Sequence, residues 1–213
     1  MNSQTSIMMA DCTRPPNFWR QIAHLHQQEI REGFLSTLSV EFLARLYAAV
    51  VRSDKLFLLA AVDGSMDKVV AFICASTDTK SVLKQCIWQS GFRLIVPLLP
   101  RLLSGRTLAH LFESMRYASN GDATLPKAEI LNFCVDGKSQ GKGVGRRLFG
   151  SLISEFSRRG VHRIKIVTGE SQVSAQLFYE AMQAYRVGTA EVHEGTKSVV
   201  FLYDINDTDR ALT

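Results

Sequence analysis

The stretch from Glu129 to Gly160 constrains the fold of this chain more than any other part of the sequence. It reads EILNFCVDGKSQGKGVGRRLFGSLISEFSRRG, an apolar run followed by a glycine-rich loop and a second apolar segment. In that segment apolar residues recur at every fourth position: Val144, Leu148, Leu152 and Phe156. The pattern predicts a strand that ends near Val135, a tight turn, and an amphipathic helix that stops at Gly160. Such a turn gathers free backbone N–H groups at the positive end of the helix, so the stretch predicts a phosphate site.

Two familiar nucleotide-binding loops do not fit this stretch. Gly137-Lys138-Ser139 looks like the end of a nucleoside-triphosphate loop, but that motif needs an earlier glycine where this chain has Asn132. The dinucleotide fingerprint needs the spacing GxGxxG, which the run from Gly141 to Gly145 does not have. The phosphate must therefore belong to another kind of ligand.

The remaining sequence predicts an α/β fold with a mixed, mostly antiparallel sheet flanked by helices. Strands are expected near 7–10, over 56–62 and 68–75 as a hairpin, and over 161–167, 185–193 and 198–203. Helices are expected from Asn17 as N-cap to about residue 32, after Ser39 to about 52, and from Ser171 or Gln172 with Val173, Leu177 and Ala181 on one face. Residues 79–118 hold no clear strand and predict a helical insertion.

Composition limits the class of protein. The 213 residues, 46% of them hydrophobic and 21% charged, fit one globular domain over 1–213. The net charge of +5 is too small to indicate nucleic acid as a partner. The four cysteines stand far apart without metal-ligand spacing, so no metal is expected, and reduced buried thiols are expected at Cys74 and Cys134. The sequence shows neither a signal peptide nor a run long enough to span a bilayer, so a cytoplasmic location is expected.

The loop resembles one particular superfamily. Gln140-Gly141-Lys142-Gly143-Val144-Gly145 matches the Q/R-x-x-G-x-G/A pattern of the GNAT acetyltransferases at every defined position. Leu177-Phe178-Tyr179-Glu180 looks like the second signature of the same superfamily. The predicted order of elements agrees with that fold as well. Two departures stand out: Gln172 occupies a position that is usually Asn, and Gln183 replaces an expected glycine.

The resemblance implies acetyl-CoA as the acetyl donor. In the family the loop binds the pyrophosphate of coenzyme A, and the preceding strand pairs its backbone with the pantetheine arm. Carried over to this chain, the resemblance implies cofactor contacts at Phe133, Cys134, Val135, Gln140, Gly141, Lys142, Gly143, Val144, Gly145, Arg146, Gln172 and Tyr179.

The resemblance also implies two catalytic residues. Tyr179 matches the family tyrosine that gives a proton to the departing thiolate, although a tyrosine beside Phe178 could instead be core packing. Glu129 stands at the distance before Gln140 where the histone-acetylating branch carries its general base, although a glutamate at a strand edge in solvent is equally expected. Glu29 is among four residues near which family members bind the acceptor; the others are Glu32, His24 and His26. Surface or core roles are favoured for all four.

Transfer of acetyl to a primary amine of a small molecule, such as an amino sugar or a nucleotide-linked amino sugar, is the expected activity. Acetylation of a protein N-terminus or lysine is the alternative within enzymes, and a non-catalytic acyl-CoA-binding module is the alternative outside them. The insertion at 79–118 could cover the acceptor site, form a homodimer surface, lie against a membrane without inserting, or only extend the core.

Overall fold

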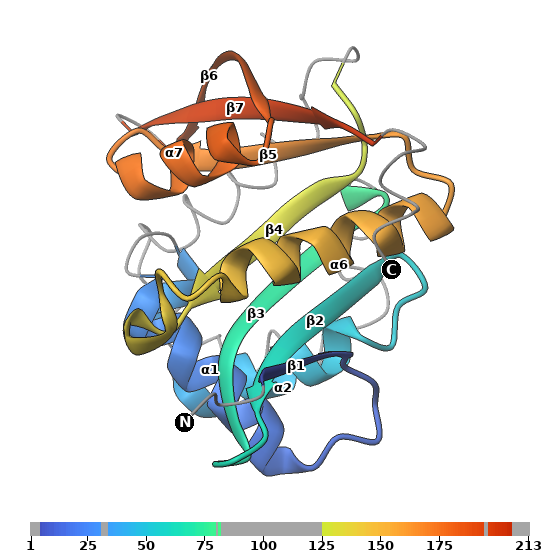
Figure 1. Cartoon of the computed structure of the whole chain (residues 1–213), viewed down its shortest axis with the longest axis vertical. Helices are drawn as coiled ribbons and strands as arrows, with labels where there is room; N and C mark the ends of the chain where they lie inside the picture. Colours follow the sequence, from blue (N-terminus) through green and yellow to red (C-terminus); the bar gives the residue numbers. More distant parts are fainter. Residues whose placement is uncertain (1–4, 31–33, 80, 82–124, 194–195, 206–213) are drawn as a thin grey trace, which may run out of the picture. The chain divides into compact units, whose positions relative to one another are not determined.

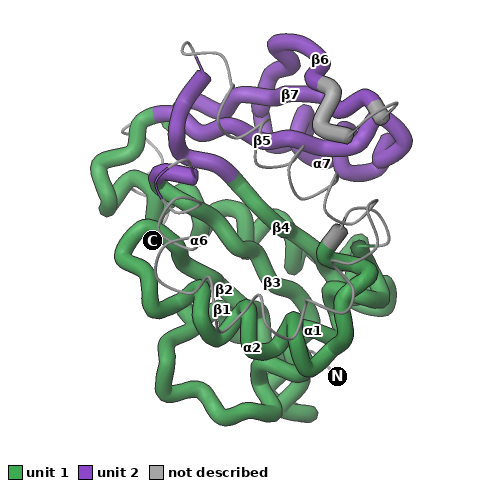
Figure 2. The backbone as a smooth tube through the Cα atoms, turned by 180° about the vertical axis from the view of Figure 1, so that it is seen from behind, with its two compact units in different colours: residues 1–77, 130–162, 205–213 green, residues 78–129, 163–204 purple. Residues whose placement is uncertain are grey.

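The structure, a computed structural model, describes residues 5–30, 34–79, 81, 125–193 and 196–205 (Figure 1). The chain divides into two compact units (Figure 2). The first contains residues 1–77, 130–162 and 205–213, and the second contains residues 78–129 and 163–204. The predicted helical insertion at 79–118 lies outside the described residues except for Thr79 and Ser81.

The first unit contains four strands in the order β1-β2-β3-β4, with three long helices. Its elements are β1 (Thr5–Met9), α1 (Pro16–Glu29), the 3-10 turn η1 (Phe34–Thr37), α2 (Val40–Val50), β2 (Leu56–Asp63), β3 (Lys68–Ser76), β4 (Glu129–Val135), the 3-10 turn η3 (Gly137–Ser139) and α6 (Val144–Arg158). The β1–β2 and β2–β3 pairings are antiparallel. Beyond the end of β4, the N–H of Asp136 donates to the carbonyl of Val70 in β3 at 2.8 Å.

Helices cover both faces of this sheet. Helix α6 crosses one face, and α1 and α2 lie against the other (Figure 1). Every residue of β2 and all of β3 except its first residue are buried, which confirms the predicted sheet flanked by helices for this hairpin. The predicted apolar stripe of α6 is buried as well, with Leu148, Leu152 and Phe156 fully inaccessible. The core of the unit therefore consists of two layers, one on each side of the hairpin.

The second unit contains the strands β5 (Arg163–Gly169), β7 (Thr196–Asp204) and β6 (Tyr185–His193), in that order, and the helix α7 (Val173–Ala181). Both strand pairings are antiparallel. Val173 and Leu177 lie on one face of α7 as predicted, but that face is not the buried one: the two side chains are 58% and 59% exposed, and Tyr179 is the buried residue of the helix. The ring of Tyr179 packs on Phe201 of β7, with the ring centroids 6.3 Å apart.

The first predicted helix has different ends from those expected. Pro15 is the N-cap and α1 begins at Pro16, rather than after a cap at Asn17. Proline is favoured in the first helical turn because its missing N–H would have no partner there. The helix ends at Glu29, whereas the sequence predicted about residue 32, and 31–33 lie outside the described residues. The cap at Ser39 is confirmed, since its hydroxyl accepts from the N–H of Phe42 at 3.3 Å. Among the described helices, none is both long and apolar enough to cross a membrane.

A buried polar pair joins α1 to α2 within this core. The Nδ1 atom of His26 lies 2.6 Å from the hydroxyl of Tyr47, and both side chains are buried beside Phe72. The buried thiols of Cys74 and Cys134 are close enough to influence Tyr47. Burial removes the hydration of the charged imidazolium form and so lowers the pKa of His26 from 6.5 to about 4.

This pair predicts a loss of stability in mild acid. The unfolded chain takes up a proton on His26 below about pH 6.5, whereas the folded chain does so only near pH 4. The free energy of unfolding should therefore fall by roughly 2 to 3 kcal/mol as the pH drops through that interval. Urea unfolding between pH 7 and 4 measures it. His26→Gln, which does not titrate, should flatten the dependence, and the exposed His24→Gln should not. An unchanged pH slope in His26→Gln would contradict this assignment.

Candidate functional site

The loop between β4 and α6 is shaped by Asp136. Its carboxylate accepts from the N–H of Lys138 at 3.0 Å and pairs with Lys68 of β3 at 2.5 Å. Its carbonyl accepts from the N–H groups of Ser139 and Gln140. The bond from Lys68, more than the bond from the Lys138 N–H, lowers the pKa of this carboxyl. Asp136 is therefore ionised at neutral pH and fixes the start of the loop.

Gln140, the first residue of the predicted motif, folds the loop back onto the strand. Its side-chain amide donates to the carbonyl of Val135 at 3.0 Å. The contact uses both the length of the glutamine side chain and its N–H group. The carbonyl of Val135 therefore already accepts a hydrogen bond within the chain. A cofactor that pairs with β4 would use the N–H of Val135 and the backbone groups that precede it.

Two glycines of the motif adopt left-handed backbone conformations. The φ angles of Gly141 and Gly143 are +71° and +78°, where other residues are strained. A Cβ atom built at either position would meet no atom of the described chain within 4 Å. The backbone of the loop is thus exposed to an approaching ligand without a side chain in between.

Helix α6 starts directly from this loop. Gly143 is its N-cap and provides no side-chain cap, and the first bond of the helix runs from the Arg147 N–H to the Gly143 carbonyl at 3.1 Å. The N–H groups of residues 144–146 precede that bond and have no carbonyl within the helix. Lys142 and Arg146 are exposed beside them. Arg147 differs, because its guanidinium donates to the Thr5 carbonyl at 3.2 Å. Free N–H groups, the helix dipole and two cations together favour an anion.

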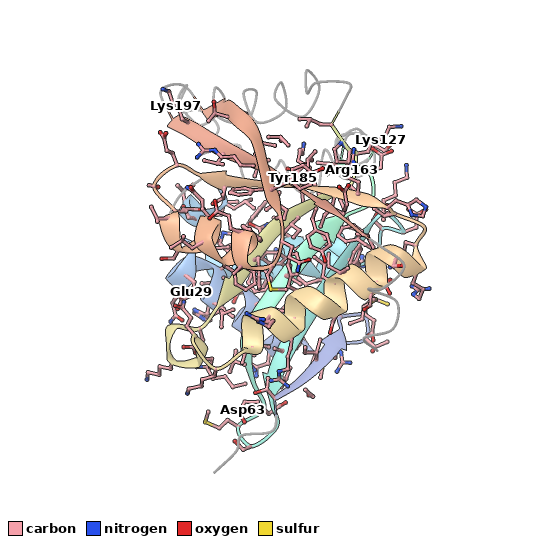
Figure 3. All side chains as sticks on the ribbon, turned by 45° about the horizontal axis from the view of Figure 1, so that its top comes forward. Glu29, Asp63, Lys127, Arg163, Tyr185 and Lys197 are labelled. Carbon is pink, nitrogen blue, oxygen red and sulfur yellow. The ribbon has the colours of Figure 1, made fainter. Side chains whose placement is uncertain are left out.

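The C-terminal end of α1 brings a second carboxylate to this loop. Glu29, the last residue of α1, accepts from the N–H of Gly137 through Oε1 at 3.1 Å (Figure 3). The thiol of Cys134 is buried, and its pKa is raised by burial and further by the charge of Glu29. Glu29 therefore lies beside the strand whose residues Phe133, Cys134 and Val135 are predicted to pair with the cofactor.

The predicted residues of the second unit are Gln172 and Tyr179. Oε1 of Gln172 accepts from the Thr168 hydroxyl at 2.8 Å and from the Gly169 N–H at 3.3 Å. The amide oxygen of Gln172 thus already accepts two hydrogen bonds within the chain. The –NH₂ group is the part of this side chain that can donate to a ligand. Tyr179 is buried, and burial raises the pKa of its hydroxyl, so that it keeps its proton at neutral pH.

Glu129, also in the second unit, forms a buried ion pair. Its Oε2 atom lies 3.1 Å from Nζ of Lys165 in β5, and the two side chains are only 12% and 11% exposed. Burial raises the pKa of Glu129, and the charge of Lys165 opposes that rise. The expectation of a strand-edge glutamate in solvent is therefore wrong. Its role as general base stays a prediction.

The sequence did not predict two contacts of the site, the one between Lys165 and Glu129 and the one between Glu29 and Gly137. Lys165 alternates with apolar neighbours in its strand, which indicates only a polar position and not the carboxylate that it meets. Glu29 was placed near the acceptor by resemblance alone, and nothing in the sequence pairs it with Gly137. Among the residues that the structure describes, no cluster of three or more histidine, cysteine or acidic side chains could hold a metal ion.

The chain matches the family model of the acetyltransferase (GNAT) family over residues 19–185. No curated protein matches it. Its fold is similar to that of the ribosomal-protein-S18-alanine N-acetyltransferase from Escherichia coli, with 14% identity, a TM-score of 0.56, and 94% and 95% of the two chains covered. It is also similar to Arabidopsis thaliana NAA60 in complex with acetyl-CoA, with 18% identity, a TM-score of 0.58, and 95% and 99% covered.

A third solved structure agrees with these two. An acetyltransferase of the GNAT family from Streptococcus pneumoniae has 12% identity, a TM-score of 0.57, and 95% and 100% of the two chains covered. At such identities the likeness shows the fold alone, whereas the family match extends over most of the chain and contains both predicted signatures. The chain belongs to the acetyltransferase (GNAT) family.

Proposed function

We propose that this protein transfers the acetyl group of acetyl-CoA to a primary amine of a small molecule, such as an amino sugar or a nucleotide-linked amino sugar. The observation that supports the cofactor is the loop after β4. Its two left-handed glycines leave open space next to the first N–H groups of α6, which have no carbonyl partner within the helix. Backbone donors of this kind suit the oxygens of a pyrophosphate, because no side chain blocks their approach.

The residues present fit coenzyme A. The N–H groups of residues 141–146 would hold the pyrophosphate, and the exposed Lys142 and Arg146 would add positive charge. The backbone of β4 from Phe133 to Val135 and the –NH₂ group of Gln172 would contact the pantetheine arm. When bound, acetyl-CoA supplies the acetyl group as a thioester.

Two side chains would handle the protons of the reaction. The acceptor must lose a proton before it can attack a carbonyl carbon, and the leaving thiolate is helped by gaining one. The Tyr179 hydroxyl keeps its proton at neutral pH and is proposed to donate it. Glu129 is proposed to accept the proton of the amine, and the nearby Lys165 keeps a carboxylate available for this despite its burial.

A screen of thiol release from acetyl-CoA tests the proposal. The panel contains glucosamine, a nucleotide-linked amino sugar, spermidine, kanamycin and peptides with a free N-terminus or a lysine. Release with a sugar or another small amine supports the proposed acceptor class. Release with peptides alone indicates the protein-acetylating alternative. Thermal stabilisation by acetyl-CoA without release from any amine indicates a binding module and contradicts the proposed transfer.

Tyr179→Phe isolates the proposed proton donor. The substitution keeps the buried ring that packs on Phe201 and removes only the hydroxyl. We expect kcat to fall by ~100-fold, as for loss of a general acid, with acetyl-CoA affinity unchanged. Tyr185→Phe is the matched control, because its exposed hydroxyl bonds Asp204 at 3.0 Å in the same unit. If the two variants had the same kcat, Tyr179 would not be the donor.

A further inference from the structure

We propose that Thr79 is a positioning residue for the base: its hydroxyl donates to the carboxylate of Glu129 and holds that carboxylate in the orientation that takes the proton of the amine. The inference deepens the proposed function and rests on it. Thr79 lies three residues beyond the end of β3, belongs to neither signature of the family, and is the first residue of the predicted insertion at 79–118. The contacts that support the inference lie within the second unit.

Backbone hydrogen bonds attach both Thr79 and Lys165 to the segment that leads into Glu129. The N–H of Thr79 donates at 3.1 Å to the carbonyl of Lys127, two residues before Glu129. The N–H of Lys165 in β5 donates at 2.9 Å to the carbonyl of Ala128, one residue before Glu129. The backbones of Thr79 and Lys165 are therefore bound to the same short piece of chain that carries the carboxylate.

The residue before Thr79 holds its own segment in place. The carboxylate of Asp78 accepts from the N–H of Ser81 at 3.1 Å and from the hydroxyl of Ser81 at 2.5 Å. These bonds join the residues on the two sides of Thr79. Together with the bond to Lys127, they fix the backbone from which the Thr79 hydroxyl extends.

The hydroxyl of Thr79 is buried without the partner that burial requires. Its Oγ1 atom has no hydrogen-bond partner in the described part of the chain. A buried polar atom in that state costs stability, and most such atoms in proteins are satisfied. The carboxylate of Glu129 is close enough for Thr79 to lower its pKa. Because a hydroxyl can rotate to direct its proton, a turn toward this carboxylate satisfies both groups.

The surroundings of Glu129 give a second donor a function. Burial raises the pKa of this carboxyl, and Lys165, with its Nζ atom 3.1 Å from Oε2, opposes the rise from β5. Thr79 opposes the rise from the segment after β3. Glu129 can accept a proton only as a carboxylate, so each donor extends the range of pH in which it can act. Two donors on different segments also fix the plane of the carboxylate.

Thr79→Val tests the inference, because valine has nearly the same shape as threonine and lacks the hydroxyl. Thr79→Ser and Thr79→Ala form a second pair, which differs from each other only by a hydroxyl. Thr77→Val is the matched control, since the hydroxyl of Thr77 donates to the carbonyl of Lys55 at 3.4 Å. The value of kcat is measured between about pH 5 and 9 with an amine accepted in the screen, at saturation, so that the profile reports groups in the bound complex.

We expect the acid limb of the kcat profile to move up by about one pH unit in Thr79→Val and Thr79→Ala, the size expected when a charged group loses one hydrogen bond. The direction follows because loss of the donor raises the pKa of the base further, so that activity appears only at higher pH. On that limb kcat is then about tenfold lower. The KM of the amine, the affinity for acetyl-CoA, and the profiles of Thr79→Ser and Thr77→Val should match the wild type.

An acid limb that stays in place in both variants without the hydroxyl overturns the role of Thr79 and leaves the proposed function intact. The same holds if the limb moves equally far in Thr79→Ser. Glu129→Gln is measured alongside them: if it keeps the kcat of the wild type, Glu129 is not the base, and this inference fails while acetyl transfer stands. If the wild type releases no thiol with any amine of the screen, the proposed function fails and this inference fails with it.

Discussion

Gly143→Asp is expected to abolish acetyl transfer while the protein stays folded. A Cβ at this position meets nothing within 4 Å, so the side chain has room, and aspartate tolerates the left-handed conformation at a cost of about 1 kcal/mol. Its carboxylate would enter the space proposed for the pyrophosphate and repel it. We expect kcat/KM to fall by at least ~100-fold, and the thermal stabilisation by acetyl-CoA to disappear.

The chain offers a matched control at the other end of α6. Gly160 has a φ angle of +72° and also has open space around its Cβ position, so Gly160→Asp introduces the same strain and the same charge away from the loop. It should bind acetyl-CoA as the wild type does. Gly143→Asn, which is nearly the same size but neutral, should keep more affinity than Gly143→Asp. If Gly143→Asp bound acetyl-CoA as tightly as the wild type does, the loop would not be part of the cofactor site.

The loop and the elements around it could be predicted from the sequence because their determinants are local. The glycines, the apolar run before them and the four-residue spacing after them are adjacent in the chain, and each has one dominant structural meaning. The cap at Ser39 and the β2–β3 hairpin were predictable for the same reason. The order of the elements along the chain followed from the same patterns, whereas the resemblance to a family supplied the expected fold.

The missed features depend on contacts between distant residues. The Glu29–Gly137 bond joins residues 108 positions apart, which no local pattern records. The burial of Tyr179 instead of Val173 and Leu177 depends on which face of α7 meets β7, and the apolar spacing of that short helix allows two faces. The Glu129–Lys165 pair forms within the second unit between side chains of two different strands. In each case the geometry of packing decided the outcome.

Lys165→Met is expected to be strongly destabilising. It leaves the carboxylate of Glu129 buried without its cation, and removal of one partner of a buried ion pair costs about 3 to 5 kcal/mol. Burial already raises the pKa of Glu129, so the folded state binds this proton more tightly than the unfolded state. Stability is therefore lost as the pH rises through the raised pKa, and the loss should be larger without Lys165. Urea unfolding at pH 5 and pH 8 should show the greater deficit at pH 8.

The double variant Glu129→Gln with Lys165→Met separates the two roles proposed for Glu129. It removes both charges, so most of the stability lost in Lys165→Met should return, since a buried pair replaced by neutral groups of similar size is often nearly neutral. If Glu129 is the general base, the double variant should still have a kcat ~100-fold or more below that of the wild type, although its stability is restored and its acetyl-CoA affinity is normal. If its kcat recovers together with its stability, Glu129 serves only to neutralise Lys165. A double variant as unstable as Lys165→Met would contradict the ion-pair account, because no charge would then remain to explain the loss.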